Sequence, residues 1–148
     1  MCIRDRRFRF DNREYEVLPD AARYELGCPP FPGVYALGAA LDYLEQVGYE
    51  AIGARVLAVN TLLTQRLTAA GLRVLSPLGR HRSGETLVAV ENPSRAQAFL
   101  EERRILVTRK PEGVRISTHF YNDESDVEAC VAALADYGRA THTAGVSG

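Results

Sequence analysis

The amino-acid sequence predicts an α+β domain of two layers, in which helices pack on a small, largely antiparallel sheet. Two observations carry this prediction. Apolar residues recur at helical spacing in four segments, and short apolar or alternating runs typical of strands lie between the second and the fourth of these segments. A turn rich in proline and glycine joins two of the runs as a hairpin, which makes that part of the sheet antiparallel.

Length, charge and cysteine content narrow the class of protein. A chain of 148 residues can bury roughly 68–70% of its unfolded surface, which is enough for a core. The net charge of −1 gives no general attraction to nucleic acid, and no apolar run approaches the roughly 20 residues that span a bilayer. Cys2, Cys28 and Cys130 are odd in number and lack metal-site spacing, which favours a reducing cytoplasm. We therefore predict a cytoplasmic protein without a nucleic-acid, membrane or metal partner.

The N-terminal half of the chain is predicted to contain an extended segment, a rigid loop and two helices. Residues 1–22 are mixed and polar, as the remnant of an upstream domain would be. Three prolines within residues 27–33 exclude a helix or a strand there. Apolar residues at helical spacing then predict helices over 33–47 and 49–70, which end at Gly48 and Gly71.

The C-terminal half supplies the sheet and two further helices. Asn92 and Pro93 are typical of an N-cap and a first helical position, and they open a helix that runs to about Arg103. The last helix begins among the polar residues before Val127 and stops at Gly138. We therefore assign residues 23–138 to the domain and 139–148 to a flexible tail. The predicted strands cover residues 73–75, 86–90, 105–108 and 114–117, with a type I turn over 110–113.

Arg115 is the strongest candidate for binding a small molecule. In the run 114–117 apolar and polar residues alternate, so Val114 and Ile116 face the core while Arg115 and Ser117 face the other side. A guanidinium held on a strand has a fixed aim, and its planar set of donors matches a carboxylate. The structural alternative is an ion pair with a nearby acid, Glu112 or Asp123.

Structural roles account for the other reactive residue types. His81 and His119 lie in loops without a nucleophile or an acid at motif spacing. Cys28 has no neighbour in the sequence that would activate a thiol. Cys130 lies near the apolar stripe of the last helix, where a structural role is expected. Asn122 and Asp123 suit helix caps, and Lys110, the only lysine, precedes the proline of a turn where a solvated side chain is expected. The sequence contains no glycine-rich phosphate loop and no HExxH motif.

Two segments resemble the small, C-terminal domain of class V aminotransferases, a family of fold-type I pyridoxal phosphate (PLP) enzymes that includes cysteine desulfurases. The first is Arg23-Tyr24-Glu25-Leu26-Gly27, followed by the proline–glycine loop and the helix that ends at Val47. The second resembles the closing arginine motif of the family and contains Val114-Arg115-Ile116-Ser117, His119, Tyr121, Asn122 and Asp126. The likeness runs in order from about Arg23 to Tyr137.

The resemblance implies specific roles for three residues. Arg115 would bind the α-carboxylate of an amino-acid substrate, and Gly27 and Cys28 would reach the PLP phosphate, usually across the interface of a homodimer. The family commonly has threonine where this chain has Cys28, and a thiol is a weaker donor than a hydroxyl. The Schiff-base lysine belongs to the large domain of the family, which these residues do not contain.

Two hypotheses follow from this resemblance. In the first, the chain is the C-terminal fragment of a PLP-dependent transferase or lyase that acts on an amino acid, and it is catalytically inactive alone. In the second, it is a stand-alone binding or interaction module that keeps the fold without the chemistry. The first predicts an uncovered apolar patch around residues 29–35. Neither hypothesis chooses among transamination, desulfuration, racemisation and hydrolysis.

Overall fold

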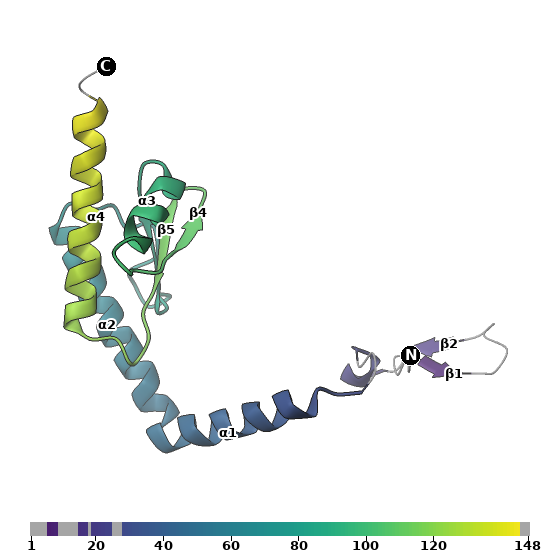
Figure 1. Ribbon diagram of the computed structural model, residues 1–148. Helices are drawn as coiled ribbons and strands as arrows, with labels where there is room; N and C mark the ends of the chain where they lie inside the picture. Colours follow the sequence, from purple (N-terminus) through teal and green to yellow (C-terminus); the bar gives the residue numbers. More distant parts are fainter. Residues whose placement is uncertain (1–5, 9–14, 18, 25–27, 146–148) are drawn as a thin grey trace. The chain divides into compact units, whose positions relative to one another are not determined.

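The computed structural model describes residues 6–8, 15–17, 19–24 and 28–145 (Figure 1). These residues fall into two compact units, divided between Val47 and Gly48. The assignment of residues 23–138 to one domain remains a prediction.

The first unit contains a two-stranded antiparallel sheet and one long helix. Strand β1 (Arg6–Phe8) pairs with β2 (Tyr15–Val17), and a short 3-10 helix, η1 (Ala21–Tyr24), follows. Helix α1 (Phe31–Val47) has no buried residue. It begins two residues before the predicted start, and Pro32 lies in its first turn. The predicted loop over 27–33 is therefore too long, because the first amides of a helix have no intrahelical partner and proline is tolerated there.

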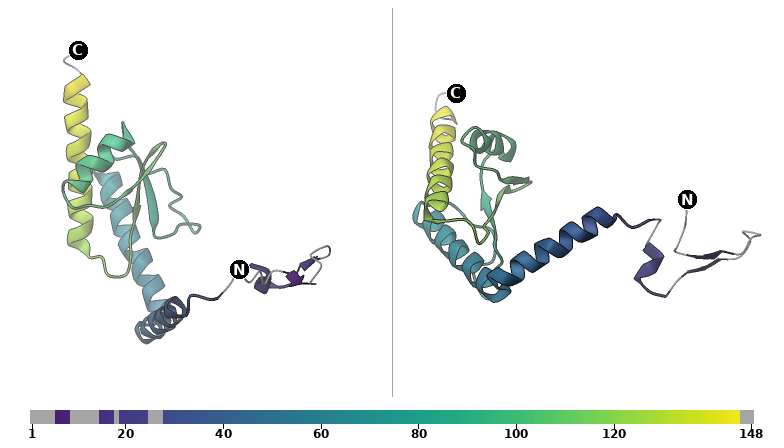
Figure 2. Two further views of the ribbon diagram at one scale, coloured as in Figure 1. Left: turned by 45° about the vertical axis from the view of Figure 1, so that its right-hand side comes forward. Right: turned by 60° about the horizontal axis from the view of Figure 1, so that its bottom comes forward.

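The second unit is a three-stranded sheet covered by helices on one face (Figures 1 and 2). All neighbouring strands are antiparallel, with β5 between β3 and β4. This arrangement confirms the predicted α+β class. In chain order its elements are α2 (Tyr49–Ala69), β3 (Glu85–Ala89), α3 (Pro93–Glu101), β4 (Thr108–Lys110), β5 (Gly113–Ser117) and α4 (Glu124–Gly145).

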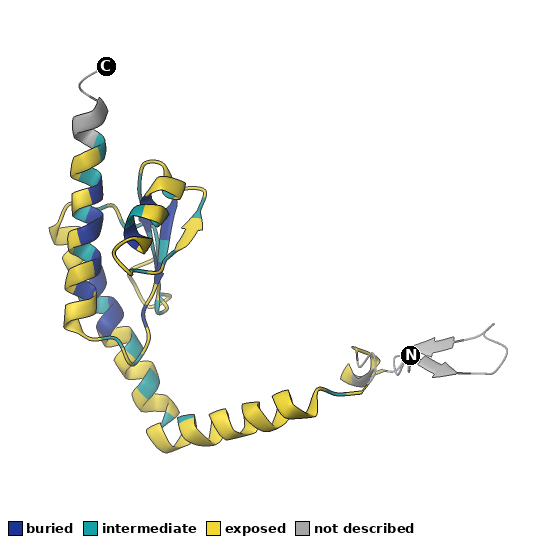
Figure 3. Cartoon of the chain, in the orientation of Figure 1, coloured by how far each residue is buried: buried dark blue, intermediate teal, exposed yellow. Residues whose placement is uncertain are grey.

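The core lies between the helices and one face of the sheet (Figure 3). Side chains of all three helices and of two strands form it, and Leu67, Leu100 and Val114 are completely buried. Burying a leucine or valine side chain contributes roughly 1.5–3 kcal/mol, so this cluster is the main source of stability. A buried hydrogen bond from Asn60 Nδ2 to Thr86 Oγ1 (2.8 Å) joins α2 to β3 within it.

The predicted strand over 73–75 is only partly formed. Val74 makes a single bridge to Val88, and the flanking bonds are Leu75 N to Leu87 O (2.8 Å) and Ala89 N to Arg73 O (2.9 Å). This segment therefore extends the sheet beyond β3 without a full ladder.

The predicted strand over 105–108 is placed too early. Arg104 has a φ of 62°, and the amide of Ile105 donates to Leu100 O (2.9 Å). Residues 104 and 105 therefore form the C-terminal cap of α3 before any strand begins. Ile105 and Val107 instead pack against the core from the loop. Pairing of β4 with β5 begins at Thr108, opposite Arg115, and ends at Lys110, opposite Gly113. The two residues between Lys110 and Gly113 form the loop of the predicted hairpin. The prediction followed apolar composition, which marks burial as readily as strand pairing.

The predicted end of the last helix at Gly138 is wrong, because α4 continues to Gly145 and includes much of the predicted tail. A glycine inside a helix costs only about 1 kcal/mol relative to alanine. Tyr137 is buried just before it, and the hydroxyl of Thr141 donates to the carbonyls of Tyr137 (3.2 Å) and Gly138 (3.0 Å). These contacts support the backbone on both sides of the glycine.

Replacing Leu63 with alanine tests the position of the core. Its side chain is 1% exposed, so Leu63→Ala should lower the free energy of unfolding by about 2–5 kcal/mol. Urea unfolding followed by circular dichroism measures this change. Leu106 is 83% exposed, and Leu106→Ala should change stability by less than about 0.5 kcal/mol. Equal losses in the two variants would show that the core is misplaced.

Candidate active site

The β5 strand brings Arg115 to the face of the sheet that the helices do not cover. Val114 and Ile116 are buried against the helices, whereas Arg115 is half-buried and Ser117 is exposed. Gly113 lies so close to β3 that a Cβ there would be 1.9 Å from the carbonyl oxygen of Val88. The alternation predicted for residues 114–117 is therefore present, and it leaves the guanidinium outside the core.

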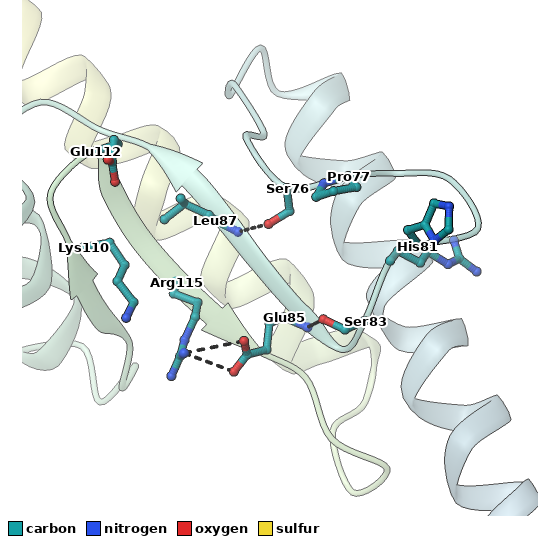
Figure 4. Close-up of a pocket in the computed structure, with 10 residues that line it drawn as sticks. Ser76, Pro77, His81, Ser83, Glu85, Leu87, Lys110, Glu112 and Arg115 are labelled. Atoms are coloured by element: carbon teal, nitrogen blue, oxygen red, sulfur yellow. Dashed lines mark hydrogen bonds and ion pairs between the residues drawn. The ribbon is translucent and has the colours of Figure 1, made fainter.

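Arg115 is paired with Glu85, from the first position of β3 (Figure 4). Nη1 of Arg115 lies 3.2 Å from Oε1 and 3.5 Å from Oε2 of Glu85. Among the described residues no ion pair joins Arg115 to Glu112 or Asp123, the acids that sequence proximity suggested. Thirty positions separate Glu85 from Arg115, and only the pairing of β3 with β5 brings them together.

A cavity of about 240 Å³ surrounds this pair. It opens on the uncovered face, and the loop that precedes β3 closes one side of it (Figure 4). Three basic and two acidic side chains line it, which leaves one net positive charge when histidine is neutral. An anionic group therefore suits the cavity better than a cation does. The ionisable lining residues are His81, Arg82, Glu85, Lys110, Glu112 and Arg115.

Lys110 is a cavity residue that the sequence prediction missed. It is the last residue of β4, it is half-buried, and it lies on the same face of the sheet as Arg115. The prediction placed it in a solvated turn because Pro111 follows. The register shows why it belongs to the face instead: Thr108 is opposite Arg115, and Lys110 is two residues further along the same strand.

The other sequence candidates lie elsewhere or have structural roles. Cys28 is an exposed free thiol in the first unit, and Gly27 lies outside the described residues, as does Cys2. Cys130 is buried in the core of the second unit, and this burial raises the pKa of its thiol to about 11. Such a thiol is protonated at neutral pH, which supports its predicted structural role. Within the described residues, no cluster of three potential metal ligands is present, and no helix is long and apolar enough to span a membrane.

The turn after β5 is organised by a reciprocal cap. Asp123 Oδ1 accepts from the amide of Asp126 (3.1 Å), and Asp126 Oδ2 accepts from the amide of Asp123 (3.2 Å), as in a capping box. The hydroxyl of Ser125 and the Asp126 amide, both donors to Asp123, lower the pKa of that carboxyl. Arg55 of α2 donates to the carbonyl of Asn122 (2.8 Å). The capping role predicted for Asp123 is confirmed.

Three aromatic rings follow β5 directly. The ring of His119 stacks on that of Tyr121, with centroids 4.7 Å apart, and contacts Phe120 at the same distance. Tyr121 is 74% exposed. His119 is therefore held by its neighbours in the chain and has no acid partner among the described contacts. His81 accepts a hydrogen bond from Nε of Arg80 (3.1 Å).

The fold and the cavity together define a small α+β domain with an arginine presented on its open sheet face. Residues 6–130 match the family model described as aminotransferase class-V. The chain belongs to this family, as its resemblance predicted.

Known proteins agree with this assignment. An uncharacterized aminotransferase, YcbU, of Bacillus subtilis is 25% identical over 78% of this chain and 31% of its own length. A probable cysteine desulfurase of Chlamydia trachomatis is 28% identical over 88% of this chain and 36% of its own. The solved structure of a C-DES variant with glycine covalently linked to its PLP cofactor shares the fold, with a TM-score of 0.73, 22% identity, and coverage of 91% of this chain and 37% of that one. This chain thus spans about a third of the length of the relatives it matches.

The lowered pKa of Asp123 makes the cap sensitive to acid. Because the folded-state pKa lies below the ordinary value of 3.8, the carboxylate should stabilise the fold fully only well above pH 4, and this stabilisation should be lost as the pH falls through the folded-state value. Asp123→Ala should therefore lower stability at pH 7, and the difference from the wild type should shrink below about pH 4. Urea unfolding at pH 7, 4 and 3 measures it.

Asp123→Asn is the matched control for this prediction, because asparagine keeps an acceptor for the amide of Asp126 but does not titrate. It should retain most of the stability at pH 7. A deficit of Asp123→Ala that stays constant from pH 7 to pH 3 would contradict the role of the carboxylate.

Proposed function

We propose that this chain is the C-terminal part of a PLP-dependent transferase or lyase that acts on an amino acid. The observation that carries the proposal is Arg115, a guanidinium aimed from a strand into a net-positive cavity, in a chain of the aminotransferase class-V family. Its task would be to bind the α-carboxylate of the substrate. Because a guanidinium binds a carboxylate through two parallel hydrogen bonds, it fixes the orientation of the substrate as well as its position.

The cofactor of the proposed enzyme is PLP. It supplies, when bound, an electron sink for bond cleavage at the α-carbon of an amino acid. The exposed Cys28 suits a contact with an anionic phosphate, and its backbone amide is a better donor than its thiol. We assign Gly27 and Cys28 to this contact, at the interface of a homodimer, on the strength of the family resemblance.

The chain's own residues fit the substrate side of such a site. Lys110 is the only lysine, and it lies at the end of β4 beside a carboxylate-binding candidate. We therefore place the Schiff-base lysine in another part of the intact protein and expect this chain to be inactive alone. Free Cys28 and Cys130 suit a reducing cytoplasm.

The alternative, a stand-alone binding module, is less well supported. A module of its own would be expected to cover its apolar surface. In α1, Phe31, Val34 and Tyr35 are 52%, 54% and 76% exposed. This exposure agrees with the apolar patch expected at residues 29–35 for a fragment.

The first test is kinetic and uses the intact enzyme encoded by the complete native reading frame. Replacing a bidentate guanidinium with an ammonium removes one charge-assisted hydrogen bond, so Arg115→Lys should lower kcat/KM for amino-acid substrates about 10- to 100-fold. Arg109→Lys is the matched control, since Arg109 lies on β4, donates to Ser94 Oγ (2.8 Å) and does not line the cavity. Unchanged kinetics in Arg115→Lys would refute the assignment.

Borohydride trapping tests the expected inactivity of the 148-residue chain. If the Schiff-base lysine lies elsewhere, reduction of the chain in the presence of PLP should leave no stoichiometric label on Lys110. Peptide mapping by mass spectrometry reads the label, and a Lys110→Arg variant sets the background. A stoichiometric adduct at Lys110 would place cofactor attachment within this chain.

A further inference from the structure

The contact between Arg115 and Glu85 uses only part of the guanidinium. Glu85 approaches Nη1 alone, at 3.2 Å and 3.5 Å from its two carboxylate oxygens. A guanidinium offers five N–H donors, and the strongest carboxylate complexes use two parallel bonds from two nitrogens. The internal pair is therefore weaker than the complex that the same guanidinium could form with a freely oriented carboxylate.

A second observation concerns Nε of Arg115. This nitrogen is buried and, among the described residues, it has no hydrogen-bond partner. An unpaired buried donor costs free energy, and few are found in native proteins. The guanidinium is thus left under-satisfied in its pairing with Glu85, at the wall of a cavity with net positive charge.

Glu85 can leave this pair at low cost. Its side chain is 52% exposed, so its carboxylate is already partly hydrated. Its backbone is fixed, because the Glu85 amide donates to Ser83 Oγ (3.1 Å) and the residue is paired with Ser117 of β5. Release of the pair therefore requires only a rotation of the Glu85 side chain away from Nη1.

We propose that Glu85 is an internal placeholder for the carboxylate ligand of Arg115, which the ligand displaces when it binds. The proposal rests on the carboxylate-binding role given to Arg115 above and adds a competitor to it. Glu85 keeps the guanidinium neutralised and aimed while the site is empty. The exchange favours planar carboxylates, which can replace one contact with two, over spherical anions such as chloride.

The exchange predicts that removing the charge of Glu85 strengthens ligand binding. In the 148-residue chain, sodium acetate serves as the carboxylate probe, and the ¹H–¹⁵N NMR signal of Arg115 Nε reports binding, at an ionic strength held constant with sodium chloride. Partly exposed ion pairs contribute little, so Glu85→Gln should lower the Kd for acetate about two- to fivefold. Glu85→Ala should lower the Kd for acetate in the same way. Agreement between the two variants would show that the effect does not come from a perturbation specific to glutamine.

Glu112→Gln is the matched control. Glu112 lines the same cavity but makes no contact with Arg115 among the described interactions, so its neutralisation changes the cavity charge equally without removing the placeholder. Its Kd should fall less than in the Glu85 variants, because the change in cavity charge is common to all three variants and only the Glu85 variants also lose the competitor.

The outcomes separate this inference from the proposed function. A clearly larger fall in Kd in both Glu85 variants than in Glu112→Gln supports the exchange. If acetate moves the Arg115 signal but the Glu85 variants bind no more tightly than the wild type, or Glu112→Gln tightens binding equally, the placeholder role is overturned and the carboxylate site stands. If acetate moves the Arg115 signal in none of the proteins, the carboxylate site fails and the exchange fails with it.

Discussion

The register of β5 between its two neighbours is the constraint on which the site depends. Val114 and Ile116 point into the core from this strand, and the hairpin to β4 fixes which residues they stand beside. A shift of the pairing by one residue would turn the whole strand over and place Arg115 among the helices. A buried guanidinium without a partner costs several kcal/mol, so the core and the exposed site enforce the same register.

The helices contribute to the site indirectly, by holding the covered face of the sheet. A buried hydrogen bond between Asn60 and Thr86 ties α2 to β3, and Tyr137 of α4 donates to the carbonyl of Glu91 (2.7 Å) ahead of α3. The capping box at Asp123 sets where α4 begins after β5, and Arg55 attaches that turn to α2. With one face of the sheet held this firmly, the open face keeps its side chains at defined positions.

The charged side chains on the open face of the sheet neutralise one another only in part. Arg115 has one acidic neighbour, bound through one nitrogen, while Lys110 lies on the same face without an ion pair among the described interactions. Such an arrangement stabilises the fold little, since partly exposed ion pairs contribute about 0–1 kcal/mol. We propose that its effect lies in binding, because the net positive charge of the cavity attracts an anion. This chain belongs to the aminotransferase class-V family, and the proteins similar to it include an uncharacterized aminotransferase and a probable cysteine desulfurase.

The sequence by itself determined the class of fold, most helix positions, the hairpin and the outward aim of Arg115. These features depend on local patterns: the spacing of apolar residues along α2, the cap at Asn92, and the alternation over residues 114–117. The prediction failed where it applied a local rule to a residue whose structure is set by contacts with other parts of the fold. Ile105 looked like a strand residue because it is apolar, and Gly138 looked like a helix end because glycine often marks one.

Only the tertiary structure decided what surrounds Arg115. Glu85 lies 30 positions away along the chain, and Lys110 joins the same face through the register of β4, so neither could be paired with Arg115 from spacing alone. Side-chain charges interact through space, and the sheet brings distant segments to within hydrogen-bond reach. The local alternation of residues therefore determines that Arg115 points outward, and the pairing of the strands determines which charged side chains lie near it.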